Sequence, residues 1–275
     1  MSALTLKLKI NLLFTLDASL LSPEYLEGKT LAEIKALKIS YGNKYVKLQT
    51  LFTIQGTDTN NICIEKSTNK LINVGKKLTK GSISIKGDVG DFLGKGMKNG
   101  IIAVEGDAGS WVGNAMCGGR IDITGNALDY VGGGLPGDAF GMNNGLINIK
   151  GNAGSRVGDR MRRGLIIIQG KAGDYCGSRI HAGTIVILGK VGNLPGEGMR
   201  RGSIILAKKP THLSATFKSC GNLKMQFLRL FFTQLYNMDT SLSFFNKYGP
   251  EAHRFSGDLA RNGKGEILIL QHYNK

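Results

Sequence analysis

The sequence predicts a mainly β protein: a right-handed parallel β-solenoid of about 19-residue coils, with a small α/β flank before it and a helical flank after it. Near-identical segments begin at glycines 19 residues apart, except for one spacing of 26. These opening glycines are Gly81, Gly100, Gly119, Gly145, Gly164, Gly183 and Gly202. After them β-branched residues alternate, as in Ile83/Ile85 and Ile166/Ile168, the pattern of a strand with one buried face. Units this short cannot bury their own apolar face, so they must stack.

Two further glycines in each unit are expected to form the corners of a coil. The first lies six residues after the opening glycine and precedes Asp, Asn or Lys, which is turn chemistry suited to positive φ at the glycine. The second lies seven residues later. Lys171 replaces Asp88 and Asp107 at the first turn, so we interpret these carboxylates as turn residues and not as metal ligands. The expected corners are Gly87, Gly94, Gly106, Gly113, Gly125, Gly132, Gly151, Gly158, Gly170, Gly177, Gly189 and Gly196.

One repeat carries seven surplus residues, because its spacing is 26 and not 19. A large apolar residue three positions before each opening glycine is expected to close the coil, as Met116 and Met161 do. Met142 falls into this row only if the surplus lies between Gly132 and Met142. The insert is therefore residues 133–141 or part of them.

The chain divides into three parts: an N-terminal strand-helix-strand flank (1–61), the solenoid (62–206), which ends in a closing strand at 203–206, and a C-terminal flank with an amphipathic helix (207–275). In the first flank we expect a strand over 4–10, a short helix opened by a capping box at Thr30 and Glu33, and a strand over 45–54. In the last flank, apolar residues step at helical spacing from Leu223 to Met238.

The outward positions of the last strands become apolar, at Ile167, Val186 and Ile205. An apolar outer face indicates a covered face, since large exposed apolar patches mark contacts. Either the C-terminal helix or a partner subunit is expected to cover it.

Composition limits the class of protein. The chain has 275 residues and a net charge of +16, which favours contact with polyanions or acidic partners. Its cysteines are widely spaced and form no C-x-x-C motif, as expected of reduced thiols in the cytoplasm. The N-terminus has no signal-peptide pattern, and residues 223–238 are too short and polar to span a bilayer. We expect a soluble cytoplasmic protein without a membrane partner.

Motifs for catalysis are lacking in the sequence. Gly28-Lys29-Thr30 resembles the end of a phosphate-binding loop, but the required earlier glycine is Pro23. The histidines form no pair at metal-ligand spacing, and His181 is expected to be a surface residue. We therefore predict no catalytic and no metal-binding residue. The glycines are corners and not phosphate ligands.

The arginines suggest a binding surface. Seven of them fall near one corner of successive coils and should form a basic stripe along the axis. This stripe is either a solvated edge or a site for a polyanion. Its members are Arg156, Arg160, Arg162, Arg163, Arg179, Arg200 and Arg201.

An aromatic row of Phe92, Trp111, Tyr130 and Tyr175 also faces outward. We expect it to pack against a flank or another polypeptide of a complex. Stacking aromatics beside a basic groove can also bind single-stranded nucleic acid. Nucleic acid is not the expected partner, because no nucleic-acid-binding module is present.

The units from Gly81 (GSISIKGDVG) and Gly145 (GLINIKGNAGSRVGDRM) resemble the GXGXG-repeat domain. That domain occurs at the C-terminal end of the glutamate synthase large subunit and in the C subunit of formylmethanofuran dehydrogenase. The resemblance covers about residues 62–206. Without amidotransferase or flavin domains, the chain is similar to the second relative. The opening Ser2-Ala-Leu-Thr-Leu and the closing residues 257–268 resemble the C subunit of the bacterial formyltransferase/hydrolase complex of methylotrophs.

The resemblance implies a non-catalytic scaffold subunit of a C1-transfer complex in formaldehyde oxidation. In that complex formyl groups pass from formyl-tetrahydromethanopterin to a methanofuran-type carrier and are hydrolysed to formate. The implied partners are the hydrolase, a protein similar to the B subunit of the dehydrogenase, and the formyltransferase. No cofactor is expected to be covalently bound, but the arginine stripe is a candidate to hold the polyglutamyl tail of the carrier. Two alternatives stay open: the C subunit of a redox formylmethanofuran dehydrogenase, and a self-standing polyanion- or nucleic-acid-binding module.

Overall fold

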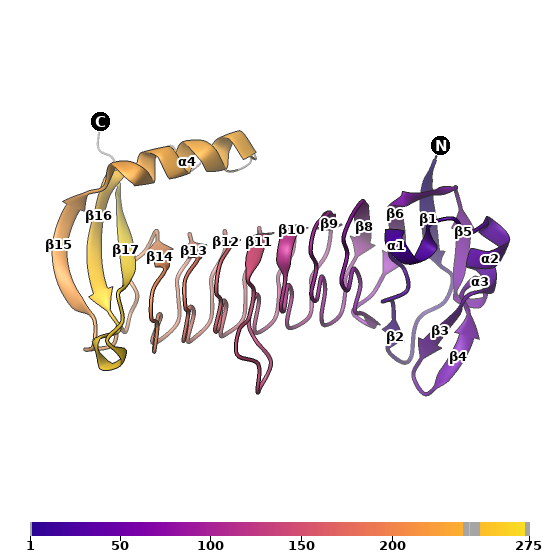
Figure 1. Ribbon diagram of the computed structural model, residues 1–275, viewed down its shortest axis with the longest axis horizontal. Coiled ribbons are helices and arrows are strands. Elements are labelled where there is room, and N and C mark those ends of the chain that lie inside the picture. The colour runs from indigo at the N-terminus through magenta and orange to yellow at the C-terminus, as the bar shows by residue number, and fades with distance from the viewer. Residues whose placement is uncertain (1, 239–241, 243–247, 273–275) are drawn as a thin grey trace.

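The computed structural model describes residues 2–238, 242 and 248–272 and places most strands in one large sheet. This sheet has 13 strands in the order β15-β16-β17-β14-β13-β12-β11-β10-β9-β8-β6-β1-β5. Figure 1 shows the repeats side by side along the long axis of the molecule, between an N-terminal and a C-terminal flank. The mainly β prediction is confirmed. The three-part division stays a prediction, and strand β6 (Asp58–Ser67) runs across its first boundary.

Each repeat contributes one parallel strand to the sheet, and equivalent residues pair. Ile83 pairs with Ile102, and Ile121 pairs with Ile147 across the insert. The register of the isoleucines is therefore the same with or without the seven extra residues. These strands are β8 (Ser82–Gly87), β9 (Ile101–Val104), β10 (Cys117–Ile123), β11 (Asn144–Ile149), β12 (Leu165–Ile168), β13 (Thr184–Ile187) and β14 (Ser203–Leu206).

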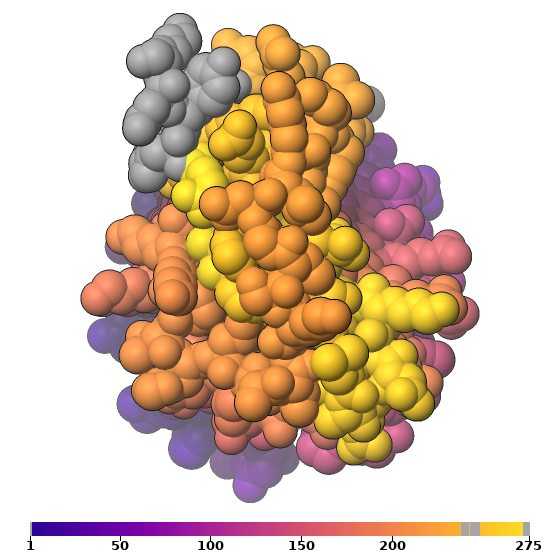
Figure 2. All heavy atoms as spheres, turned by 90° about the vertical axis from the view of Figure 1, so that its left-hand side faces the viewer, coloured from indigo at the N-terminus to yellow at the C-terminus, as the bar shows by residue number. Residues whose placement is uncertain are grey.

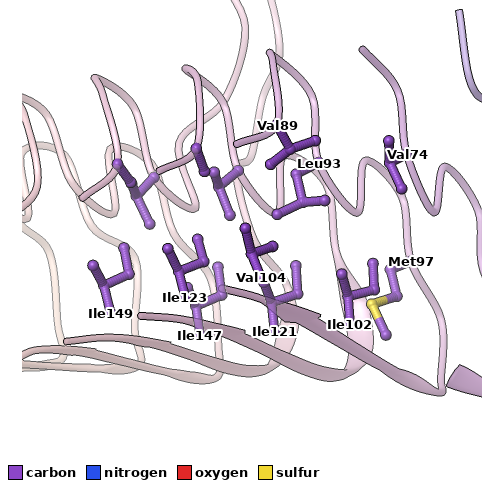
Figure 3. Packing of buried hydrophobic residues seen from close by; sticks show 14 of the residues in the cluster. Val74, Val89, Leu93, Met97, Ile102, Val104, Ile121, Ile123, Ile147 and Ile149 are labelled. Atoms are coloured by element: carbon purple, nitrogen blue, oxygen red, sulfur yellow. The ribbon is translucent and has the colours of Figure 1, made fainter. Parts of the chain in front are cut away.

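The interior of the repeats is filled by rows of identical or similar apolar side chains. Figure 3 shows Ile102, Ile121 and Ile147 following one another along the sheet, with Val89 and Leu93 facing them from the opposite side. All five are at most 1% exposed. Full burial of one such side chain stabilises the fold by roughly 1.5–3 kcal/mol. A second row of parallel bridges joins Val89, Ala108, Ala127, Ala153, Ala172 and Val191.

Polar side chains at the first corner connect neighbouring repeats through their backbones. The Oδ1 atom of Asp88 accepts a hydrogen bond from the amide of Asp107 at 2.9 Å, and Asp107 does the same for the amide of Asn126 at 2.6 Å. Asn126 and Asn152 continue this series. These carboxylates and amides are therefore structural turn residues, as the sequence indicated.

The reason for glycine at the first corner differs from the expected one. Gly87 has a φ of +118°, but Gly106 and its equivalents do not lie in the left-handed region. A Cβ on Gly106 would lie 2.6 Å from the backbone C and O atoms of Gly87. Close approach of adjacent repeats, and not positive φ, excludes a side chain here. At the second corner positive φ does occur, from +63° at Gly94 to +76° at Gly196.

The N-terminal flank extends the sheet with β1 (Ala3–Leu8), parallel to β6, and β5 (Phe52–Gln55), antiparallel to β1. The large sheet therefore continues beyond β6, the strand that contains Ile62, into the N-terminal flank. A second sheet has the order β4-β3-β2-β7. Its strands are β2 (Leu16–Asp17), β3 (Lys38–Tyr41), β4 (Lys44–Lys47) and β7 (Leu71–Ile72).

Three short helices complete this flank: α1 (Pro23–Leu26), α2 (Leu31–Ala36) and α3 (Leu48–Leu51). The capping box that opens α2 is confirmed, because Thr30 and Glu33 exchange both expected hydrogen bonds. The single strand expected over 45–54 is wrong. The helix α3 interrupts it, because Leu48 and Leu51 lie three positions apart and both point into the core.

The C-terminal flank also joins the large sheet, although the 19-residue period does not predict this. Strand β17 (Gly265–His272) pairs in parallel with β14, so the strand at 203–206 does not close the sheet. Strands β16 (Tyr248–Gly257) and β15 (Lys218–Lys224) follow in antiparallel pairing, and a 3-10 turn covers Leu259–Arg261. Figure 2 shows these C-terminal residues at the end of the molecule.

Helix α4 (Gln226–Met238) lies along the outer face of the last repeats (Figure 1). Leu223 belongs to β15 and not to this helix, so the helix begins later than expected. Its residues Leu228, Phe232 and Leu235 form one buried cluster with Ile167, Val186 and Ile205. The helix is thus the element that covers the apolar outer face. No helix in the described residues is long and apolar enough to cross a membrane.

Candidate functional site

Four of the predicted arginines form one exposed basic corner: Arg162 and Arg163 in one repeat, Arg200 and Arg201 two repeats later. His181 lies between them. The backbone amides of Arg162, His181 and Arg200 donate to Met142, Met161 and Ile180 of the preceding repeats, each at 2.8 Å. These three residues therefore occupy equivalent positions in successive repeats, and about 10 Å separates the backbones of Arg162 and Arg200. We call these four arginines the basic corner.

Arg179 carries a charge that the protein itself neutralises. Its guanidinium donates to both carboxylate oxygens of Asp159, at 2.9 and 2.7 Å. The Asp159 side chain is 2% exposed and also accepts a hydrogen bond from Ser178 at 2.6 Å. This bidentate pair fixes both side chains. Arg179 therefore offers less charge to a ligand than the basic corner does.

Arg156 and Arg160 lie elsewhere. The guanidinium of Arg156 lies 4.7 Å from the ring centroid of Tyr175, and Arg156 continues the row of Phe92, Trp111 and Tyr130. The side chain of Arg160 donates to the carbonyl of Asp138 at 2.5 Å, in the inserted segment. The seven predicted arginines are therefore not one uniform stripe.

The inserted segment packs against the basic corner through Phe140. Its ring lies 4.8 Å from the guanidinium of Arg162 and 5.0 Å from the ring of His181, edge to face. The sequence did not indicate this contact, since nothing in the repeat pattern tells where an insert folds. An aromatic residue in an insert beside a row of cationic residues is the feature of the sequence that could have indicated this cation–π contact.

His181 is half-buried, although the sequence indicated a surface position. Burial lowers the pKa of its imidazole below the usual 6.5, and the positive charges of Arg200 and Arg162 lower it further. The imidazole is therefore neutral at pH 7. It can accept or donate one hydrogen bond between two cationic groups.

Three residues of the aromatic row form a stack of rings, and Arg156 separates them from Tyr175. Phe92 and Trp111 have ring centroids 5.4 Å apart with planes at 14°, and Trp111 and Tyr130 are 5.2 Å apart at 11°. Left-handed backbone recurs at this position in every repeat, Arg156 and Tyr175 included. Because the ring faces contact one another, mainly their edges face outward. The row is built as a structural ladder.

A further hollow of about 470 Å³ lies between α4 and the start of β10–β12. Opening glycines 119, 145 and 164 form its floor, and Phe231 and Leu235 form its wall. Arg120 in this hollow pairs with Asp122 at 2.6 Å. Within the described residues, no group of three or more His, Cys, Asp or Glu side chains is arranged to hold a metal ion.

Comparison with known proteins gives the family. The GXGXG motif family matches residues 43–226, more than half of the chain. The chain belongs to the GXGXG motif family. A solved structure of the formyltransferase/hydrolase complex (FhcABCD) from Methylorubrum extorquens, in complex with methylofuran, contains a chain similar to this GXGXG protein. The two are 37% identical, with a TM-score of 0.90 over 98% of this chain and 100% of that chain.

Curated relatives of this GXGXG protein are the C subunits of tungsten-containing formylmethanofuran dehydrogenase 2. The Methanothermobacter marburgensis protein is 37% identical over 84 residues, which are 29% of this chain and 31% of that protein. The Methanococcus maripaludis protein is 34% identical over 95 residues, 34% of this chain and 35% of that protein. This chain spans about a third of the length of these relatives. The resemblance inferred from the repeat motifs is confirmed.

Proposed function

We propose that this chain is a non-catalytic scaffold subunit of a cytoplasmic formyltransferase/hydrolase complex, in which a right-handed β-solenoid holds the other subunits. The similarity over 98% of this chain and 100% of a chain of such a complex carries the proposal. The polar residues on the repeats support it, because Asp88 and Asp107 bind backbone amides and Asp159 binds Arg179. These groups are engaged in holding the fold. The proposed partners are the hydrolase, the protein similar to the dehydrogenase B subunit, and the formyltransferase.

Purification of the tagged chain from its native host tests this proposal. We expect transferase and hydrolase polypeptides to co-purify at low salt, and the complex to release formate from a formylated carrier. The isolated chain is expected to release none. Recovery of the chain alone at every salt concentration would refute the scaffold role. Formate release by the isolated chain would refute its non-catalytic nature.

We further propose that the basic corner holds the polyglutamyl tail of a methanofuran-type carrier. Exposed arginines about 10 Å apart along a row suit an extended chain of carboxylates, with which each guanidinium forms charge-assisted hydrogen bonds. The aromatic row supports nucleic acid less well, because neighbouring rings and the guanidinium of Arg156 already lie against its ring faces.

Poly-L-glutamate is a direct probe of this part of the proposal. Replacement of Arg162 and Arg163 by Glu should weaken its binding roughly 10-fold or more and should reduce the dependence of binding on salt. Lys171→Glu with Lys190→Glu is the matched control, since it changes the net charge by the same amount and both lysines are exposed at the first corner. Equal binding by the arginine variant and the lysine variant would show that the corner is only solvated.

A second candidate is the C subunit of a redox formylmethanofuran dehydrogenase, as the names of the curated relatives suggest. Those similarities extend over about a third of each chain, whereas the similarity to the formyltransferase/hydrolase structure extends over nearly all of this one. The length of the match favours the first candidate. Metal analysis of the purified native complex separates the two, because the redox enzyme contains tungsten or molybdenum and the other does not.

A further inference from the structure

The insert at 133–141 is the one departure from the 19-residue period among the seven opening glycines, and the pairing of the strands does not depend on it. Strands β10 and β11 pair on either side of it with their isoleucines in register. Figure 1 shows the loop between these strands projecting beyond the outline of the other repeats. A segment that adds nothing to the core and extends from the surface is available for contact with another molecule.

The loop is held rigidly. At its tip the amide of Asp138 donates to the carbonyl of Leu135 at 2.9 Å, and the Leu135 amide donates to the Asp138 carboxylate at 3.0 Å. Between these residues Pro136 and Gly137, with a φ of +90°, suit a type II turn. The Arg160 side chain ties this tip to the next repeat.

The base of the loop is held as firmly. The buried amide group of Asn114 donates to the carbonyl of Gly133 at 2.9 Å. The amides of Gly134 and Gly141 donate to the carbonyls of Asp159 and Arg160, at 3.1 and 2.9 Å. Together with the contacts of Phe140, these bonds fix both ends of the loop. A loop ordered before binding loses little conformational entropy when a partner binds.

The most exposed residues of the loop are uncharged, and its surroundings are positive. Pro136, Gly137, Ala139 and Phe140 are exposed, and Asp138 is engaged in the turn. Beside them lies the basic corner, to which Phe140 is joined through Arg162. The complementary surface is an apolar recess with a rim of carboxylates.

We propose that the loop 133–141 is a rigid docking knob that inserts into an acidic-rimmed apolar recess of another subunit of the complex. This inference rests on the proposed function and adds the surface through which it is carried out. Phe140 is the apolar anchor, and Arg162, whose guanidinium lies 4.8 Å from its ring, contacts the carboxylate rim, so that Arg163, Arg200 and Arg201 stay exposed for the carrier tail. Aromatic anchors surrounded by charged groups commonly dominate the affinity of such interfaces.

Deletion of residues 134–140 gives a clean test, because it restores the period of 19. The variant reads Gly132-Gly133-Gly141-Met142, the Gly-x-x-Met pattern of Gly113–Met116. In other repeats the residue before this Met has positive φ, as at Ala115 with +54°, and Gly141 can adopt it. The variant should therefore fold, with a melting temperature within about 3 °C of the original.

The tagged full-length chain is co-expressed with the hydrolase, the protein similar to the dehydrogenase B subunit, and the formyltransferase, and each captured polypeptide is quantified. We expect the deletion and Phe140→Ala each to lower retention of one particular partner about 10-fold or more, whereas Lys190→Glu leaves retention unchanged. Arg162→Glu with Arg163→Glu should make retention of that same partner weaker at low salt.

The outcomes separate the two proposals. Wild-type retention of every partner by the deletion variant overturns the docking knob and leaves the scaffold role intact. Loss of retention on arginine replacement alone, with no effect of the deletion or of Phe140→Ala, also overturns the knob. Failure of the unaltered chain to retain any of the three partners overturns the proposed function and the knob with it.

Discussion

Replacement of Gly106 by Ala tests whether contact between repeats, and not backbone conformation, requires glycine at the first corner. The new methyl group would lie 2.6 Å from the C and O atoms of Gly87 and would also meet the Asp88 side chain. Since Gly87 is backbone of the preceding repeat, the two repeats must move apart. The control is Gly28→Ala, where φ is +74° but no atom lies within 4 Å of the added carbon.

The expected cost follows from what the movement disrupts. Overpacking in a close contact costs roughly 1–3 kcal/mol. The separation also stretches the hydrogen bonds from Asp107 N to Asp88 Oδ1 and from Val89 N to Asp107 O, now 2.9 and 2.8 Å. Each such bond contributes about 0.5–1.5 kcal/mol. We expect Gly106→Ala to cost about 2–4 kcal/mol and Gly28→Ala about 1 kcal/mol.

Thermal unfolding followed by circular dichroism at one fixed scan rate measures the difference. For a chain of this size the melting temperature should fall by roughly 5–12 °C in Gly106→Ala and by about 2–4 °C in Gly28→Ala. A fall of less than about 2 °C in Gly106→Ala would refute the steric reasoning. So would a larger fall in Gly28→Ala, because conformation would then be the dominant cost.

Three further predictions concern buried and half-buried groups. Burial raises the pKa of the Cys176 thiol to about 12, so iodoacetamide at pH 8 should label exposed Cys117 and leave Cys176 unmodified until the protein unfolds; labelling of both at one rate, by mass spectrometry, would contradict this. The lowered pKa of His181 means that the folded state binds its proton less readily than the unfolded state, so stability is complete above pH 6.5 and falls as the pH drops from 6.5 toward the folded pKa. His181→Asn should flatten this part of the urea-measured pH profile, and an unchanged slope would contradict it. Phe232→Ala should cost about 3–5 kcal/mol by urea unfolding, because Phe232 is 3% exposed against the outer face of the sheet, and a loss below about 1 kcal/mol would show that the helix contributes little.

The parts of the fold that recur in every repeat could be predicted from the sequence. Strand β14 lies at 203–206 as expected, because the same alternation of residues marks each strand. The cover over Ile167 and Val186 was predictable for a physical reason, since apolar side chains on an outer face require a partner.

The parts that occur once could not be predicted in the same way. Gly265-Glu-Ile-Leu-Ile matches the opening of a repeat, but it lies 63 residues after Gly202, so the period did not reveal that β17 joins the sheet. The reason for glycine at the first corner was wrong, because the distance between repeats is not written in the local sequence. The pairing of Arg179 with Asp159 depends on the conformations of side chains in two neighbouring repeats. The basic stripe was inferred from sequence positions alone, and these do not give side-chain conformations.

The parallel pairing of the repeats has a consequence for the distances within any assembly of this chain. Each repeat moves the chain forward by one strand spacing, about 4.8 Å. The separation along the axis between features on different repeats, such as the loop at 133–141 and Arg200, is therefore a whole number of fixed steps. Duplication or loss of 19 residues would lengthen or shorten this reach by one step and leave the chemistry at both ends unchanged. The number of repeats between two surfaces of this chain therefore sets the distance between the molecules that bind to them.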